Sequence, residues 1–333
     1  MTNLTTNKLD FEQASRLVQS ANRILLVTHL NPDGDALGSL LGLANALWAQ
    51  GKTLDAAVDD GVYKSLSFLP NSQKVYPKLT VGDWDLMISL DASDEVRTGH
   101  VGEYGRKHSK QVINVDHHVT NTLFGDTHLV MVDAVSTTQI VFEWLQFMKL
   151  PIEEPLVALP LLTGLVTDTL GFRTSNVTAR TLEIAHHLMK AGASLTEIMT
   201  RTLENKSYAV IQLWAEVLPS VKLQQGVISI DILYKQFHNN PAEESTTGSL
   251  VGLLNQVEEA RIAAIFQETQ DGKVKLSLRS KHGYNVGEVA FTLGGGGHTQ
   301  AAGVTLAEPM AAARERVMPM LFKAVADGEW IIT

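Results

Sequence analysis

Short apolar runs alternate with longer helical patterns over residues 24–200. Five of the runs predict buried strands: ILLVT (24–28), TLDAAV (53–58), DLMISL (85–90), QVINV (111–115) and HLVMV (128–132). The stretches between and after them predict helices over 36–50, 136–149, 153–167 and 178–190. Strands that alternate with helices form a mostly parallel sheet whose two faces are covered by helices. The first part of the chain is therefore predicted to be an α/β domain.

A smaller domain is predicted to follow. Three strand patterns, GVISIDI, ARIAAIFQE and KVKLSLRS, surround a helix near 248–258, and a glycine run precedes a helix near 309–326. A polar helical pattern over 196–217 leads into this region. We therefore divide the chain into a first domain at 1–200, a linker helix at 201–219 and an α+β domain at 220–333.

The composition narrows the chemistry. The 333 residues include no cysteine, so disulfides and thiolate sites are excluded, and any metal must be held by oxygen and imidazole. The N-terminal MTNLTTNKLDFEQ has no export-type apolar core, and no run of about 18 apolar residues predicts a membrane span. We expect a cytoplasmic protein with no membrane partner. The formal net charge of -9 argues against long duplex DNA as the main partner, but not against a small anionic ligand.

Acidic and imidazole side chains gather where the predicted strands end. In open α/β sheets, ligands bind beyond the carboxyl ends of the strands. One further carboxylate lies in the apolar stretch LVTDTLGF. The candidates, in chain order, are His29, Asp33, Asp35, Asp91, Asp116, His117, His118 and Asp168. Alone, each has a simpler interpretation as a cap, a turn residue or a structural histidine. Their coincidence at one sheet edge favours a metal site.

Burying so many carboxylates together is costly unless protons or cations neutralise them. Two divalent cations about 3.5–4 Å apart can clamp both oxygens of an in-line displacement at phosphorus. Imidazole mixed with carboxylate suits Mn²⁺, and Mg²⁺, iron or Co²⁺ stay open. The pattern therefore predicts a two-metal phosphoesterase.

Four motifs, HLNPDGD, LDASD, VDHH and TDT, resemble in order and spacing those of the DHH phosphoesterases. That superfamily includes RecJ-like exonucleases and the family II inorganic pyrophosphatases. LRSK followed by GGGGHTQAAG is similar to the DHH-associated domain, so the resemblance extends from about residue 20 to 310. The subgroup it resembles most is the compact two-domain oligoribonucleases (nanoRNases) and 3'-phosphoadenosine 5'-phosphate (pAp) phosphatases.

The resemblance implies roles for the candidate residues. One cation would take His29, Asp33 and Asp91, and the other would take Asp35, Asp91, His117 and Asp168. Asp91 would bridge the two cations, Asp116 would orient its neighbours, and His118 would face the phosphate and assist the leaving oxygen. The resemblance also implies a homodimer.

The second domain carries candidates for substrate binding. Lys273, Lys275, Arg279 and Lys281 share one strand face by their period-two spacing. A solvated face is the alternative for the lysines. The resemblance assigns Arg279 and Ser280 to phosphate binding. Gly295, Gly296, Gly297 and His298 are expected to form a phosphate-binding loop, although a glycine run is ordinarily a flexible turn. This domain is expected to close over the metal cleft and anchor one end of the substrate.

The expected reaction is hydrolysis, by hydroxide activated between two metals, of short oligoribonucleotides to mononucleotides, of pAp to AMP, or of both. The alternative is a phosphodiesterase for a cyclic dinucleotide (c-di-AMP) or for pApA. A pyrophosphatase is disfavoured because that group lacks the LRSK and GGGGH elements. A pure nucleic-acid binding module is a further alternative, and the intact ligand set argues against it.

Overall fold

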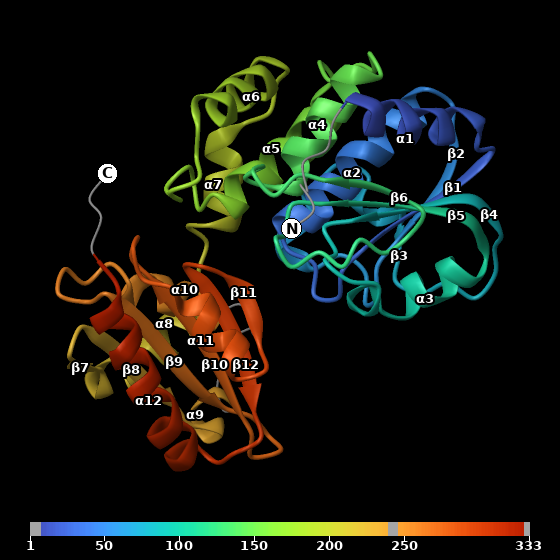
Figure 1. Cartoon of the computed structure of the whole chain (residues 1–333). Coiled ribbons are helices and arrows are strands. Elements are labelled where there is room, and N and C mark those ends of the chain that lie inside the picture. The colour runs from blue at the N-terminus through green and yellow to red at the C-terminus, as the bar shows by residue number, and fades with distance from the viewer. Residues whose placement is uncertain (1–7, 239–245, 330–333) are drawn as a thin grey trace. The chain divides into compact units, whose positions relative to one another are not determined.

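The computed structural model describes residues 8–238 and 246–329 and divides the chain into two compact units, Met1–Asn205 and Lys206–Thr333. Each unit has its own sheet and its own buried apolar cores (Figure 1). Within the described residues, the helices are too short or too polar to cross a membrane.

The first unit is built on six parallel strands in the order β3-β2-β1-β4-β5-β6. Their bounds are Arg23–Thr28 (β1), Thr53–Ala57 (β2), Val75–Tyr76 (β3), Trp84–Leu90 (β4), Ser109–Asp116 (β5) and Thr127–Val130 (β6). Strands β2 and β3 lie on one side of β1, and β4, β5 and β6 lie on the other, so the strand order changes direction between the neighbours β1 and β4. Ligands bind at such a switch point in α/β folds. The prediction of a mostly parallel α/β domain is confirmed.

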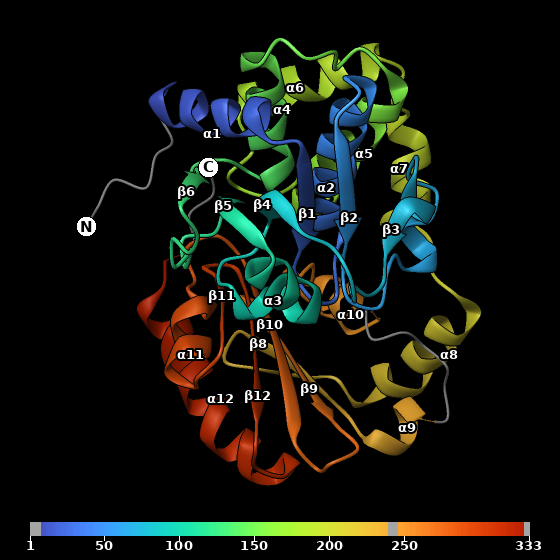
Figure 2. The ribbon, with the colours of Figure 1, turned by 90° about the vertical axis from the view of Figure 1, so that its right-hand side faces the viewer.

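The described residues of this unit form seven α-helices. They are Lys8–Ser20 (α1), Gly34–Ala49 (α2), Gly99–Lys107 (α3), Thr137–Phe147 (α4), Pro155–Asp168 (α5), Ala179–Lys190 (α6) and Leu195–Thr202 (α7). The larger apolar core lies between the sheet and α2, α4 and α5, and a smaller one lies under α3 on the opposite face (Figures 1 and 2). Both sheet faces are thus covered, which explains why the strands read as continuous apolar runs.

Helices α2 and α5 pack closely because glycines line their contact. A Cβ on Gly38 would meet the Pro160 carbonyl oxygen at 2.5 Å, and one on Gly42 would meet Leu161 Cδ2 at the same distance. A methyl group at Gly38 would clash with the backbone of α5, and one at Gly42 would force the Leu161 side chain to move. The close crossing brings the C-terminal end of α5 to the N-terminal end of α2, where the candidate site lies.

The second unit has a mostly antiparallel sheet in the order β11-β12-β10-β9-β8-β7, in which only β8 and β9 pair in parallel. The strands are Lys222–Gln224 (β7), Val227–Ile232 (β8), Ile262–Glu268 (β9), Val274–Ser280 (β10), Gly296–His298 (β11) and Ala301–Leu306 (β12). The helices are Tyr208–Val217 (α8), Tyr234–His238 (α9), Thr246–Leu254 (α10), Val286–Thr292 (α11) and Met310–Asp327 (α12). Helices α8 and α10 cover one face, and α11 and α12 cover the other. This is the smaller α+β domain that was predicted.

The segment predicted as a linker helix over 201–219 contains the end of α7, a break, and α8. The break lies at 203–207, where Ser207 caps α8 by accepting a hydrogen bond from the Val210 amide. Val210, Leu213 and Val217 are buried against the second sheet. The helix α8 therefore belongs to the core of the second unit.

Candidate metal centre

The loop after β1 brings three candidate ligands together. His29 follows the strand directly, and Asp33 caps α2, where its Oδ1 accepts hydrogen bonds from the amides of Asp35 and Ala36 at 3.0 Å. Asn31 takes a left-handed backbone conformation (φ 54°), which lets the loop turn sharply between them. Nδ1 of His29 lies 2.8 Å from the Leu30 carbonyl oxygen. A carbonyl can only accept, so Nδ1 donates and Nε2 is the atom available to a metal.

Asp91 is central to the cluster. Its Oδ2 lies 3.5 Å from Nε2 of His29, and its Oδ1 lies 3.7 Å from Nε2 of His117. Asp91 is 2% exposed and has a left-handed backbone (φ 60°), an uncommon conformation for a residue other than glycine. Its amide donates to the Val115 carbonyl of β5 at 2.9 Å, which anchors this turn to the neighbouring strand. A constrained backbone thus directs the Asp91 carboxylate between two imidazoles.

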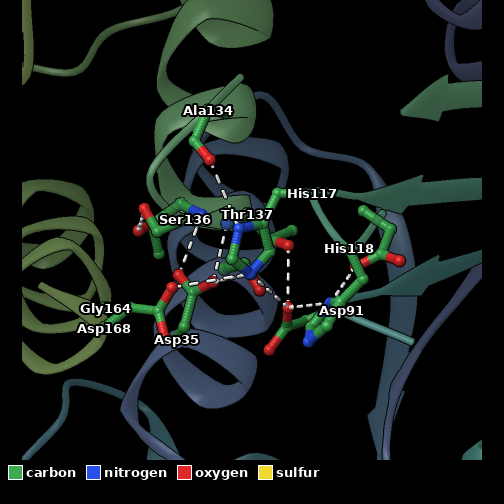
Figure 3. Close-up of polar contacts among 12 residues, drawn as sticks. Asp35, Asp91, His117, His118, Ala134, Ser136, Thr137, Gly164 and Asp168 are labelled. Carbon is green, nitrogen blue, oxygen red and sulfur yellow. Dashed lines mark hydrogen bonds and ion pairs between the residues drawn. The ribbon is translucent and has the colours of Figure 1, made fainter. Parts of the chain in front are cut away.

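Asp35 is held by the N-terminus of α4 (Figure 3). The amides of Thr137 and Thr138 donate to its two oxygens, at 2.6 Å to Oδ2 and 2.9 Å to Oδ1. The Thr137 hydroxyl donates to Oδ1 of Asp91 at 2.8 Å. One helix terminus therefore fixes two of the carboxylates, and its dipole favours their negative charge.

His117 and Asp168 complete the group. Nε2 of His117 lies 3.5 Å from Oδ2 of Asp168 and 4.0 Å from Oδ2 of Asp35 (Figure 3). Nδ1 of His117 lies 3.3 Å from the Ala134 carbonyl, so this ring also turns Nε2 toward the carboxylates. Asp168 is the last residue of α5 and reaches the site from a helix.

The side chains form two triads with metal-ligand spacing that share one member. One is His29, Asp33 and Asp91, and the other is Asp35, Asp91 and His117, with the ligand atoms of each triad within 4.8 Å of one another. These are the groups assigned above to the two cations, and Asp168 lies beside the second. A third group joins Asp91, Asp116 and His118, in which Nδ1 of His118 lies 2.7 Å from Oδ1 of Asp116.

The pKa shifts of these groups indicate that the protein alone does not neutralise the cluster. Burial and the neighbouring charges of Asp91 and Asp33 raise the pKa of Asp35 well above its usual value. Burial and the charge of Asp35 do the same to the pKa of Asp168. Burial lowers the pKa of His29, but the hydrogen bond to Asp91 and the charge of Asp33 outweigh it and raise this pKa to about 9. Oxygen and imidazole donors with excess negative charge fit divalent cations.

The residues predicted to bind substrate lie in the second unit. Arg279 is on β10, with Nη1 donating to the Leu278 carbonyl at 2.9 Å. Ser280 points to the opposite face, where it is buried and its hydroxyl donates to the Tyr284 carbonyl at 2.6 Å. The structure therefore does not bring the side chains of these two neighbours together.

The predicted glycine loop is partly an edge strand. Gly296, Gly297 and His298 form β11, which pairs with β12. A Cβ on Gly297, whose φ is 134°, would meet the Ala301 carbonyl oxygen at 2.4 Å. Gly297 thus has a structural reason to be glycine, in addition to any role with a ligand.

Sequence reasoning missed the residues that position the ligands. Thr137, Thr138 and Asn121 contact candidate site residues, the first two through their backbone amides as well as their side chains. Ser136 is the first residue of the helix predicted over 136–149, and in the structure its side chain caps α4 by accepting a hydrogen bond from the Gln139 amide. The predicted start of this helix was the signal in the sequence for such support, because the backbone amides at a helix N-terminus bind anionic groups such as carboxylates.

Comparison with known proteins identifies the family of the chain. Residues 23–165 match the model of the DHH family, N-terminal domain, and residues 229–326 match that of the DHHA1 domain. The bifunctional oligoribonuclease and PAP phosphatase NrnA of Thermus thermophilus is 34% identical over 286 residues, covering 85% of this chain and 84% of that protein. The chain belongs to the DHH family. The predicted family resemblance is confirmed.

Two further relatives of this DHH protein are informative. The cyclic-di-AMP phosphodiesterase GdpP of Geobacillus thermodenitrificans is 24% identical over 88% of this chain but matches over only 46% of its own length. The crystal structure of an exopolyphosphatase-related protein from Bacteroides fragilis has a TM-score of 0.86 at 21% identity, covering 97% of this chain and 98% of that one. The second likeness supports the fold of the chain.

Proposed function

We propose that this DHH protein is a metal-dependent phosphoesterase that hydrolyses short oligoribonucleotides to mononucleotides, pAp to AMP, or both. The main support is the pair of metal-ligand triads that share Asp91. The chain is also similar over most of its length to an oligoribonuclease and pAp phosphatase. The match is long enough to include parts of both units, and the DHHA1 match at 229–326 includes the region proposed to bind substrate.

The triads would hold two divalent cations, and we propose Mn²⁺ because imidazole and carboxylate are mixed in both. Bound there, the cations would supply positive charge that stabilises the transition state and favours hydroxide over water. The chain's own residues keep the ligands in place. Asp91 would bridge the cations, and Asp35 and Asp168 would complete the second site with His117.

His118 is proposed to act on the leaving group. Water-derived hydroxide forms the new bond to phosphorus, the bond to the nucleoside oxygen breaks, and that oxygen receives a proton from Nε2 of His118. The contact between Nδ1 and Asp116 supports this role, because it turns Nε2 to the opposite edge of the ring.

Arg279 is proposed to bind a substrate phosphate, together with the glycine segment Gly295–His298. Burial lowers the pKa of the Arg279 guanidinium, which nevertheless stays charged at neutral pH. A buried, charged guanidinium is stabilised by an anion, and a guanidinium can bind phosphate through two hydrogen bonds. Formation of a homodimer stays a prediction from the resemblance.

Cleavage of c-di-AMP or pApA is the second candidate, favoured by the similarity to a cyclic-di-AMP phosphodiesterase. That similarity is weaker in identity and covers a smaller share of the relative, so we place it second.

A substrate panel tests the proposal. Purified protein with Mn²⁺ is assayed against short RNA, pAp, pApA, c-di-AMP and pyrophosphate, beside the variants Asp91→Asn and Arg279→Lys. We expect turnover of short RNA or pAp, loss of turnover in Asp91→Asn, and a raised KM in Arg279→Lys. Turnover of c-di-AMP alone would transfer the assignment to the second candidate. Salt-sensitive binding of long RNA without hydrolysis would refute both.

A further inference from the structure

We propose that Asn121 is a positioning residue for this reaction, because it fixes the Asp116 carboxylate that orients His118. The inference rests on the proposed function, since it concerns the group assigned to the leaving oxygen. Asn121 belongs to neither metal-ligand triad.

The Asp116 carboxylate is held at both of its oxygens. Nδ2 of Asn121 donates to Oδ2 at 2.6 Å, and Nδ1 of His118 lies 2.7 Å from Oδ1. Asp116 is fully buried. Without the Asn121 amide, Oδ2 would lose this donor in a buried place, and the carboxylate would be able to rotate to recover a partner. Rotation would move Oδ1 away from His118.

Asn121 is itself fixed on three sides. Its side-chain Oδ1 accepts a hydrogen bond from the backbone N–H of Leu123 at 2.7 Å, and its own backbone N–H donates to the His118 carbonyl at 3.1 Å. Nδ2 also lies 3.4 Å from the Ala92 carbonyl, to which the Asn114 side chain donates at 3.0 Å. Ala92 follows Asp91 directly. The side chain therefore ties the turn after β4 to the segment after β5, the two places that supply Asp91 and His118.

Loss of the Asn121 contact should affect protonation of the leaving group by His118. A nucleoside oxygen is a poor leaving group unless it receives a proton as the bond to phosphorus breaks. A nitrophenolate leaves without one. Misplacing His118 should therefore slow cleavage of pApA far more than cleavage of the p-nitrophenyl ester of thymidine 5'-phosphate. A general disturbance of the cation site would slow both alike.

Two variants distinguish the proposed positioning role of Asn121 from a role in the structure of the segment after β5. In Asn121→Ser the hydroxyl can still accept from the Leu123 amide but is too short to reach Asp116. Asn121→Asp keeps the size and the acceptor and replaces the donor with a carboxylate oxygen. Thr122→Val is the matched control. It removes the hydroxyl that donates to the Ser93 carbonyl at 3.1 Å in the same segment, and it leaves Asp116 untouched.

We expect both Asn121 variants to lose roughly 10–100-fold in kcat on pApA, with a much smaller loss on the nitrophenyl ester and little change in KM. Thr122→Val should keep the wild-type ratio between the two substrates. Equal losses on both substrates, or no loss on either, would overturn the inference.

A spectroscopic measurement tests the inference without turnover of a nucleotide. The proton between His118 and Asp116 should give a downfield NMR resonance in the Mg²⁺-loaded protein, identified by its absence in His118→Asn. We expect it to shift or vanish in Asn121→Ser and to persist in Thr122→Val. An unchanged resonance in Asn121→Ser would overturn the inference. Wild-type protein that cleaves neither short RNA nor pAp would refute the proposed function separately, and the resonance would still decide the role of Asn121.

Discussion

Gly164 lies where α5 passes the Asp35 carboxylate, and its replacement by alanine should weaken cation binding. A Cβ at this position would lie 2.6 Å from Oδ1 of Asp35 and 2.3 Å from Cγ2 of Thr138. Ordinary contacts begin at 3.4 Å, so the neighbours would have to move by about 1 Å. The Asp35 carboxylate cannot move this far and keep its hydrogen bonds to the amides of Thr137 and Thr138.

The size of the effect follows from the two costs. Overpacking of a tight core costs about 1–3 kcal/mol of unfolding free energy. Disturbing the support of a metal ligand costs roughly 10–100-fold in affinity, or about 1.4–2.8 kcal/mol. We therefore expect Gly164→Ala to lose stability and, separately, to bind Mn²⁺ at least tenfold more weakly. Calorimetric titration of the folded protein measures the affinity, and thermal unfolding measures the stability.

Gly42→Ala is the matched control, because it lies in the same contact between α2 and α5. Its Cβ would lie 2.5 Å from Cδ2 of Leu161, a side-chain end that can rotate, and the three nearest atoms all belong to Leu161. It should lose stability with wild-type affinity for Mn²⁺. A folded Gly164→Ala protein that binds Mn²⁺ as tightly as Gly42→Ala would refute the reasoning.

Three further predictions concern other contacts within the first unit. Thr137→Val removes the hydroxyl that donates to Asp91 and keeps the amide on Asp35, so Mn²⁺ affinity should fall roughly tenfold and Thr137→Ser should restore it. Cation binding should release protons, and the affinity should increase as pH rises toward 9, because Asp35 and His29 have raised pKa values and must lose protons to become ligands. Proton release makes the measured binding enthalpy depend on the ionisation enthalpy of the buffer. A binding enthalpy that is the same in different buffers would contradict the prediction. Hydrogen bonds from Lys110 and from the amides of Arg23 and Asn22 lower the pKa of Asp85 from 3.8 to about 2, so its contribution to stability is present above pH 3.8 and is lost as pH falls toward 2. The difference in melting temperature between wild type and Asp85→Asn should therefore narrow over that range.

Much of the fold could be predicted because strand and helix periods are local signals. The runs at 24–28, 85–90 and 111–115 correspond to β1, β4 and β5, whose carboxyl ends meet at one sheet edge. The place of Asp91 and His117 follows from that rule alone. The polar helix expected over 196–217 was only partly right. Its pattern does not reveal that the chain breaks at 203–207 and that α8 packs on another sheet.

The support of the site could not be predicted, because it depends on contacts between distant segments. Asp35 is held by backbone amides more than 100 positions away, and an amide has no sequence signature. Asp168 reaches the cluster from a helix, at a place set by the close packing of α5 on α2. Ser280 was assigned from its motif, but the alternation of side chains along β10 turns it away from Arg279.

The opposed pKa shifts explain why protons are a poor substitute for cations at this site. The imidazoles around Asp91 outweigh its burial and lower its pKa, so this carboxylate is charged throughout the neutral range. Burial and that same charge raise the pKa values of Asp35 and Asp168, so each new negative charge is disfavoured by the one already present. A proton on Asp35 would neutralise this carboxylate alone and leave the charges of its neighbours in place. A divalent cation carries two positive charges and would neutralise more than one carboxylate at once. This group of buried carboxylates is therefore better neutralised by divalent cations than by protons.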